Sequence, residues 1–229
     1  MKTSNKMTAP KTIFLTSSII DTLPDIVTHF ERPAKGLSLA FISTASEVEG
    51  GMRSWIYDDL SFFHNLGFFA FQYTITDKNE SQVREDLKLV DIIFVAGGNV
   101  FYLLDKIHKS GFSTIAREHV NQGKIYIGES SGSLVAAPDL TIAHREEALE
   151  KVPGMTDFTG MGLVDFTVFP HWGSLKNKDF YLAHRMVKSY EMGHKIILLT
   201  DKQYVFVKGD WIKILEAPQK SPQPEQPLI

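Results

Sequence analysis

Short apolar runs alternate with longer segments of helical period along most of this chain, and this alternation limits the fold more than any other feature. The apolar runs that we expect to form strands are Thr12–Thr16, Leu37–Ile42, Phe68–Tyr73, Ile92–Ala96, Ile125–Gly128, Leu163–Phe169 and Ile196–Thr200. Strands that alternate with helices tend to pair in parallel, with the helices covering both faces of the sheet. The sequence therefore predicts a three-layer α/β fold with a mostly parallel sheet.

The segments between these runs carry apolar residues at helix spacing. Val100, Leu103, Leu104 and Ile107 follow the i, i+3, i+4, i+7 pattern of an amphipathic helix. Two further stripes are expected to form helices: Met52, Trp55, Ile56, Leu60 and Phe63, ended by Gly67, and Phe180, Val187 and Tyr190, ended near Gly193.

The alternation stops near the C-terminus. Tyr204–Val207 and Trp211–Leu215 flank Lys208-Gly209-Asp210, which predicts a β-hairpin with glycine in the turn. Residues 217–229 are rich in Pro and Gln, and we expect a disordered tail there. Residues 1–216 are then expected to form a single α/β domain.

Composition excludes several classes of chemistry. The chain of 229 residues has no cysteine, which removes disulfides, thiolate metal sites and a cysteine nucleophile. Its 24 basic and 27 acidic residues give a net charge of -3, so we expect neither nucleic acid nor a membrane as partner. The first residues lack the apolar run of a secretory signal, and no stretch is long enough to span a membrane, which favours a cytoplasmic location. No metal-ligand spacing and no nucleotide-binding glycine fingerprint occur, so no cofactor is expected.

Small and polar residues follow four of the expected strands. They are Ile42-Ser43-Thr44, Ala96-Gly97-Gly98-Asn99, Gly128-Glu129-Ser130-Ser131-Gly132 and Pro170-His171. In an open parallel sheet, ligands bind beyond the carboxyl ends of the strands. We therefore expect these four segments to converge at one edge of the sheet.

The segment Gly128–Gly132 matches the G-x-S-x-G nucleophile elbow, in which a serine on a strained strand-to-helix turn exposes its Oγ. Ser130 is thus the candidate nucleophile. The helix expected after it offers free N–H groups to a developing oxyanion. The alternative interpretation is a Ser/Gly-rich loop that only caps the helix.

Gly97 and Gly98 precede the helix of Val100 and could turn backbone N–H groups toward a ligand. Gly98 and Ser131 are therefore the candidate oxyanion donors. A phosphate-binding turn or simple close packing remain alternatives for the glycine pair.

His171 is the candidate general base, because serine needs a base with a pKa near 7 and His171 is the histidine expected at a strand end. His144 is a rival base in a loop. An acidic residue should orient the imidazole. The loop from Asp139 to Lys151 offers Asp139, Glu146, Glu147 and Glu150, and spacing alone does not select one.

These residues together resemble the dipeptidase E (aspartyl dipeptidase) family of serine peptidases, which also contains the cyanophycinases. The matching pieces are Gly-Gly-Asn-x-Phe-x-Leu-Leu at Gly97–Leu104, the elbow at Gly128–Gly132, Ala-Pro-Asp at Ala137–Asp139, and Gly-Leu-Val-Asp-Phe followed by Pro-His at Gly162–His171. The resemblance covers about Thr12 to Lys213. It implies a class I glutamine amidotransferase-like fold, flavodoxin-like in its three layers, in which serine replaces the cysteine of the amidotransferases.

The resemblance also implies roles for particular residues. Ser130 becomes the nucleophile, His171 the base, and Gly98 and Ser131 the sources of the oxyanion donors. Glu147 best matches the acidic triad position, with Glu146 second. We also expect Asn99, Glu129 and Trp172, the sequence neighbours of these residues, to bind substrate.

This chain departs from the family at two places. Ser131 stands where the family usually has alanine, a change that keeps the backbone donor. The arginine-bearing stretch that holds the substrate's acidic side chain in the aspartyl dipeptidases is not recognisable in Trp172–Tyr181.

The leading functional hypothesis is hydrolysis of short peptides through an acyl-enzyme on Ser130. An α/β-hydrolase esterase is a second reading, disfavoured because only 41 residues separate Ser130 from His171. A catalytically silent binding module on the same fold is the third. The sequence leaves the oligomeric state open, with a homodimer as one option.

Overall fold

The structure is a computed structural model that describes residues 10–218 except 52, 145, 176 and 177, and it leaves the side chains of Glu146, Glu147 and Phe180 undescribed. Most of the expected tail therefore lies outside the described residues. The strands are β1 Thr12–Thr16, β2 Ser38–Ile42, β3 Phe69–Tyr73, β4 Ile92–Val95, β5 Ile125–Glu129, β6 Thr167–Phe169, β7 Ile196–Leu198, β8 Gln203–Lys208 and β9 Trp211–Glu216. The α-helices are α1 Ile19–Ile26, α2 Ser54–Asn65, α3 Glu80–Leu87, α4 Val100–Ser110, α5 Phe112–Asn121, α6 Ser131–Leu134, α7 Glu146–Leu149, α8 Lys178–Phe180 and α9 Met186–Glu191.

The main sheet has seven strands in the order β3-β2-β4-β5-β1-β8-β9. The first five pair in parallel, whereas β8 runs antiparallel to β1 and β9 antiparallel to β8. The mostly parallel sheet and the C-terminal hairpin predicted from the sequence are both confirmed.

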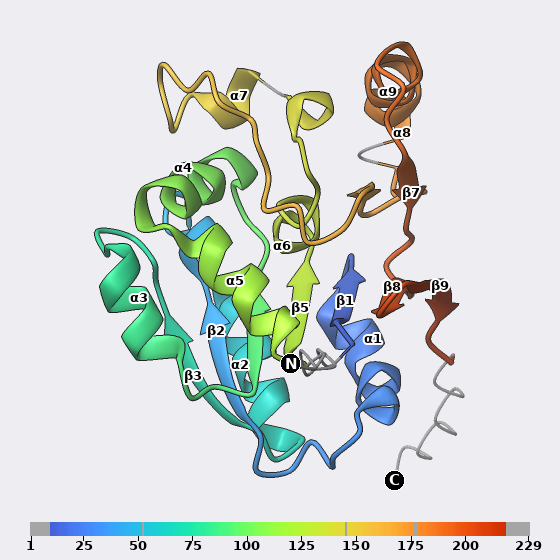
Figure 1. Ribbon diagram of the computed structural model, residues 1–229. Coiled ribbons are helices and arrows are strands. Elements are labelled where there is room, and N and C mark those ends of the chain that lie inside the picture. Colours follow the sequence, from blue (N-terminus) through green and yellow to red (C-terminus); the bar gives the residue numbers. More distant parts are fainter. Residues whose placement is uncertain (1–9, 52, 145, 176–177, 219–229) are drawn as a thin grey trace, which may run out of the picture.

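Helices cover both faces of the sheet (Figure 1), and the side chains of its central strands are therefore buried on both sides. In β1, Ile13 and Leu15 pack into a core with α3, α4 and α5, while Phe14 between them packs into a second core with α1 and α2. This alternation follows from the two-residue period of a strand. The sheet is thus the middle of three layers, as the fold class predicted.

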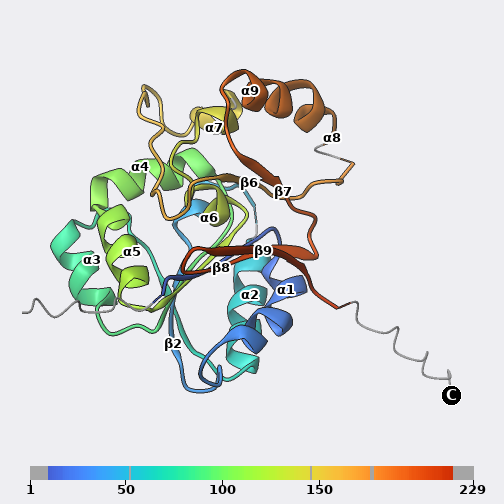
Figure 2. The same ribbon diagram turned by 45° about the vertical axis from the view of Figure 1, so that its right-hand side comes forward.

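The strand expected over Leu163–Phe169 is shorter than predicted and is not part of the main sheet. Only β6 is extended, and it pairs in parallel with β7 in a separate two-stranded sheet, which Figure 2 shows above the C-terminal hairpin. The N–H groups of Leu163 and Val164 instead bond to the carbonyl of Ala136. In the main sheet β1 lies between β5 and β8, and β6 pairs with β7 alone.

The third predicted helix is interrupted. The chain passes from α8 through a π-helical segment, Tyr181–Arg185, into α9. π-Helical turns are rare and often occur at functional sites, and this one faces the site described below. Among the described residues, no helix is long and apolar enough to cross a membrane.

Candidate active site

The turn between β5 and α6 holds Ser130 in a strained backbone conformation, with φ 48° and ψ -106°. Its N–H donates to the carbonyl of Thr16 at 2.9 Å, which ties the turn to the neighbouring strand. Residues other than glycine rarely adopt a positive φ, and such backbone conformations persist only where the surrounding structure enforces them. The strained strand-to-helix turn expected at Ser130 is therefore present.

The two glycines of the elbow are required by close packing. A Cβ on Gly128 would lie 2.5 Å from the carbonyl oxygen of Gly132. A Cβ on Gly132 would lie 2.0 Å from the carbonyl oxygen of Val95 in β4. Both distances are far below van der Waals contact, so only glycine lets α6 begin directly against the sheet.

His171 lies beside Ser130, as expected. It follows β6 after one residue, and its own φ is 60°. Its Nε2 is 3.1 Å from Ser130 Oγ, within hydrogen-bond distance, and its backbone N–H donates to Ser17 Oγ at 3.1 Å. The rival, His144, packs instead against the rings of Phe101 and Phe158.

The acidic partner of His171 is not the one expected. Asp201 Oδ1 lies 2.6 Å from His171 Nδ1, so Asp201 occupies the position predicted for Glu147. Asp139 is excluded as that partner, because its carboxylate accepts from the N–H and hydroxyl of Thr141. The side chains of Glu146 and Glu147 lie outside what the structure describes. The prediction of a loop carboxylate at this ring nitrogen is therefore corrected to Asp201.

A signal for Asp201 was present in the sequence. The apolar run that contains β7 is followed by Thr200-Asp201, which is a further polar segment after a strand. The same reasoning that selected His171 after β6 applies to Asp201 after its parallel neighbour β7.

Two backbone N–H groups flank Ser130. Gly98 has a φ of 135°, and a Cβ there would lie 2.4 Å from the carbonyl of Ala45. The hydroxyl of Ser131 donates to the carbonyl oxygen of Gly98, which fixes the two backbones against each other. Neither the Gly98 nor the Ser131 N–H donates to a described residue, so both are available to a bound oxygen.

A pocket opens beside Ser130 and His171. Its walls come from the turns at Gly98 and Ser131, from Ala148 of α7, and from Tyr181 and Arg185 of the π-helical segment, and Glu49 lies at its margin. Figure 1 shows α7 and the α8–α9 segment on either side of α6. The pocket is thus bounded on two sides by segments outside the main sheet.

Arg185 brings a cation into this pocket. It is buried, its Nη1 donates to Tyr181 Oη at 3.2 Å, and its guanidinium lies 4.9 Å from the ring centres of both Tyr181 and Phe169. Arg185 lies four residues beyond Trp172–Tyr181, the stretch in which the arginine of the aspartyl dipeptidases is not recognisable.

The three residues expected to bind substrate have different positions. Asn99 lines the pocket, but its Oδ1 caps α4 by accepting from two backbone N–H groups. Trp172 packs against Tyr181 without lining the pocket itself. Glu129 is buried on the opposite side of the elbow, where it accepts from the N–H of Ile19 at 2.8 Å, so its predicted contact with substrate is wrong.

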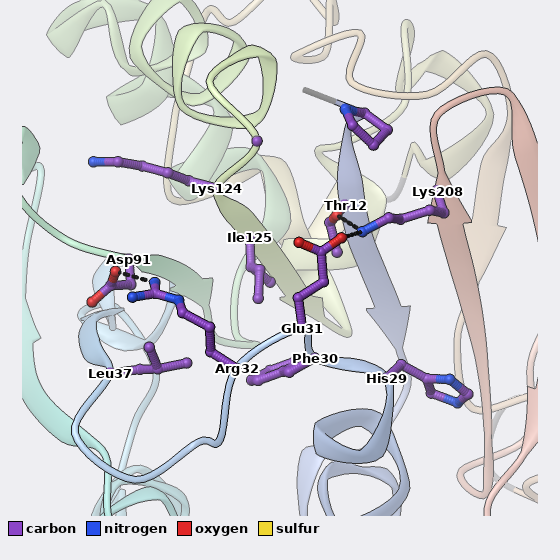
Figure 3. Close-up of a pocket in the computed structure, with 12 residues that line it drawn as sticks. Thr12, His29, Phe30, Glu31, Arg32, Leu37, Asp91, Lys124, Ile125 and Lys208 are labelled. Atoms are coloured by element: carbon purple, nitrogen blue, oxygen red, sulfur yellow. Dashed lines mark hydrogen bonds and ion pairs between the residues drawn. The ribbon is translucent and has the colours of Figure 1, made fainter. Parts of the chain in front are cut away.

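A second hollow lies at the other end of the strands (Figure 3). Arg32 pairs with Asp91 and Lys208 pairs with Glu31 across it, and Lys124 also lines it. It contains no serine beside a histidine.

A strained serine beside an imidazole and a carboxylate, in a three-layer α/β fold, is typical of hydrolytic enzymes. The comparison with known families is more specific: a model of peptidase family S51 matches residues 13–215. The chain belongs to peptidase family S51 and is a peptidase. The resemblance to the dipeptidase E family is thereby confirmed.

Individual relatives agree with this assignment. An uncharacterized peptidase of Listeria monocytogenes is 29% identical over 199 residues, which is 87% of this chain and 95% of that protein. Peptidase E of Shewanella amazonensis is 26% identical over 198 residues, covering 77% of this chain and 76% of that protein. A crystal structure from Listeria monocytogenes, provisionally assigned as a peptidase E, has a TM-score of 0.80 at 25% identity and covers 91% of this chain and 99% of its own.

Proposed function

We propose that this peptidase is of the serine type and hydrolyses short peptides through an acyl-enzyme on Ser130. The observation that carries the proposal is the contact of 3.1 Å between Ser130 Oγ and His171 Nε2, with Asp201 at the other ring nitrogen. A nucleophile, a base and a group that orients the base are the three parts that such a mechanism needs.

The reaction would proceed in two stages. As Ser130 Oγ attacks the peptide carbonyl carbon, His171 Nε2 accepts the hydroxyl proton. The N–H groups of Gly98 and Ser131 then stabilise the oxyanion. His171 returns the proton to the leaving amine, and a water activated by the same imidazole hydrolyses the ester. Asp201 accepts a hydrogen bond from the Nδ1–H of His171 throughout, which keeps Nε2 free to act as base.

A cation in the pocket supports an acidic substrate. Arg185 lines the pocket together with Ala148, Tyr181 and the carboxylate-bearing Glu49. The buried guanidinium of Arg185 would favour a substrate that carries a carboxylate near the scissile bond. We therefore infer a preference for peptides with an acidic residue over the corresponding neutral ones.

Labelling with a fluorophosphonate tests the mechanism directly. The reagent should form an adduct on Ser130 in the wild type, and Ser130→Ala should abolish it. Ser131→Ala is the matched control, since it removes the adjacent hydroxyl but keeps the backbone N–H. An adduct that persists in Ser130→Ala, or a wild type that never labels, would refute the serine mechanism and favour a binding module.

A dipeptide library then separates peptide from ester hydrolysis and tests Arg185. Release of amino acids from acidic dipeptides should exceed release from neutral ones, and Arg185→Met should remove that difference. Cleavage of simple esters alone, with no dipeptide released, would favour an esterase instead.

A further inference from the structure

Glu129 directly precedes Ser130, yet its side chain projects to the opposite side of the sheet, toward α1 and α2. It is 8% exposed and lies against Asp59 of α2, which is 4% exposed. Glu129 Oε1 accepts from the N–H of Ile19, the first residue of α1, at 2.8 Å. The N–H of Gly97, the neighbour of the oxyanion donor Gly98, lies close enough to this carboxylate to lower its pKa.

One side chain therefore links three parts of the site. Through its own backbone Glu129 is joined to Ser130, through Gly97 to the oxyanion turn, and through Asp59 to α2. The side-chain contact between Glu129 and Asp59 joins two carboxyl groups. Two buried carboxylates side by side cannot both keep their charge without a strong repulsion, so they retain a proton between them.

We propose that Glu129 and Asp59 share one proton, and that this protonated pair acts as a buried strut that positions Ser130 and the Gly97–Gly98 turn for catalysis. Glu129 is then a positioning residue, because it acts on the reacting atoms only through the backbone. The proposal rests on the proposed function of Ser130.

The charges around the pair determine how it should respond to pH. Burial, followed by the charge of Asp59, raises the pKa of Glu129, and the N–H groups of Ile19 and Gly97 oppose this only in part. Burial also raises the pKa of Asp59, with a smaller contribution from the exposed carboxylate of Asp58. When the shared proton is lost at alkaline pH, two like charges face each other beneath the elbow, and the strut should fail.

This predicts an alkaline limb in the reactivity of Ser130. A Ser–His pair alone becomes more reactive as the imidazole loses its proton and then stays level. The rate of labelling by a fluorophosphonate, followed from about pH 6 to about pH 9.5, should instead rise and then fall.

Glu129→Gln keeps the acceptor for Ile19 and can still bond to Asp59, but it cannot gain the second charge. It should label within a few-fold of wild type at neutral pH and should lose the alkaline limb. Glu129→Ala removes the strut and should label roughly 10- to 100-fold more slowly, the scale of a misplaced reacting group. Asp58→Asn, which removes an exposed carboxylate one residue from Asp59, is the matched control and should keep the limb.

A limb that persists in Glu129→Gln, or wild-type labelling by a folded Glu129→Ala, would overturn the proposal. A second arm is independent of the mechanism: the melting temperature of Ser130→Ala, which carries no nucleophile, should fall between about pH 6 and about pH 9. Adding Glu129→Gln to that variant should flatten the decline. An unchanged decline overturns the shared proton even if Ser130 proves unreactive in the wild type.

Discussion

Replacing Ser130 with glycine should stabilise the folded chain relative to replacing it with alanine, although both changes remove the hydroxyl. At φ 48° and ψ -106°, a residue with a Cβ is in a region that only glycine occupies easily. Such strain costs about 1–3 kcal/mol. Glycine loses about 0.5–1 kcal/mol of this advantage because its unfolded chain is more flexible.

The net difference in the free energy of unfolding should therefore be roughly 1 kcal/mol in favour of Ser130→Gly. For a chain of this size, that corresponds to a melting temperature about 2–4 °C higher. Both variants lose the contact with His171, so this loss cancels in the comparison. Circular dichroism melts at one scan rate, together with urea unfolding midpoints, would measure it.

Ser131 provides the control, because it is the first residue of α6 and has a helical backbone. There the order should reverse, with alanine more stable than glycine by about 0.5–1 kcal/mol. If Ser130→Gly is no more stable than Ser130→Ala, then the elbow is not strained and the reasoning from its backbone angles is wrong.

Three further results are expected. Gly132→Ala places a Cβ 2.0 Å from a main-chain oxygen of β4 and should destabilise by about 2 kcal/mol or more in urea unfolding, whereas Gly50→Ala, with nothing within 4 Å, should be close to neutral. Asp201→Asn should lower kcat roughly 10²- to 10⁴-fold in a peptidase assay. Glu147→Gln should have little effect on kcat in the same assay. If Glu147→Gln instead lowers kcat more than Asp201→Asn does, then Glu147 is the acidic partner of His171, as the sequence predicted. Burial lowers the pKa of His119 in the folded chain to about 4. Below about pH 6.5 the unfolded chain therefore binds a proton at His119 before the folded chain does, and the free energy of unfolding should fall by a contribution on the order of 3 kcal/mol as the pH falls toward 4. His119→Gln should flatten this acid decline in thermal melts.

What could be inferred from the sequence was local in origin. The apolar runs and their spacing specified the strands, since side-chain period and burial are properties of neighbouring residues. The turn at Ser130 was recognisable for the same reason, because its five-residue pattern lies within one strand-turn-helix unit, although the clash that requires Gly132 involves Val95 of the neighbouring strand β4. His171 was selected because polar residues that follow strands are candidates for the site, but β6, which carries it there, lies in the separate two-stranded sheet.

The tertiary structure decided the rest. Asp201 reaches His171 only because β6 and β7 pair outside the main sheet, and that pairing depends on which strand edges remain open. Glu129 points away from the pocket because successive side chains at the end of β5 alternate between faces, and its partner Asp59 comes from a helix 70 residues earlier. Contacts between distant segments follow from how whole elements pack, which no short stretch of sequence encodes by itself.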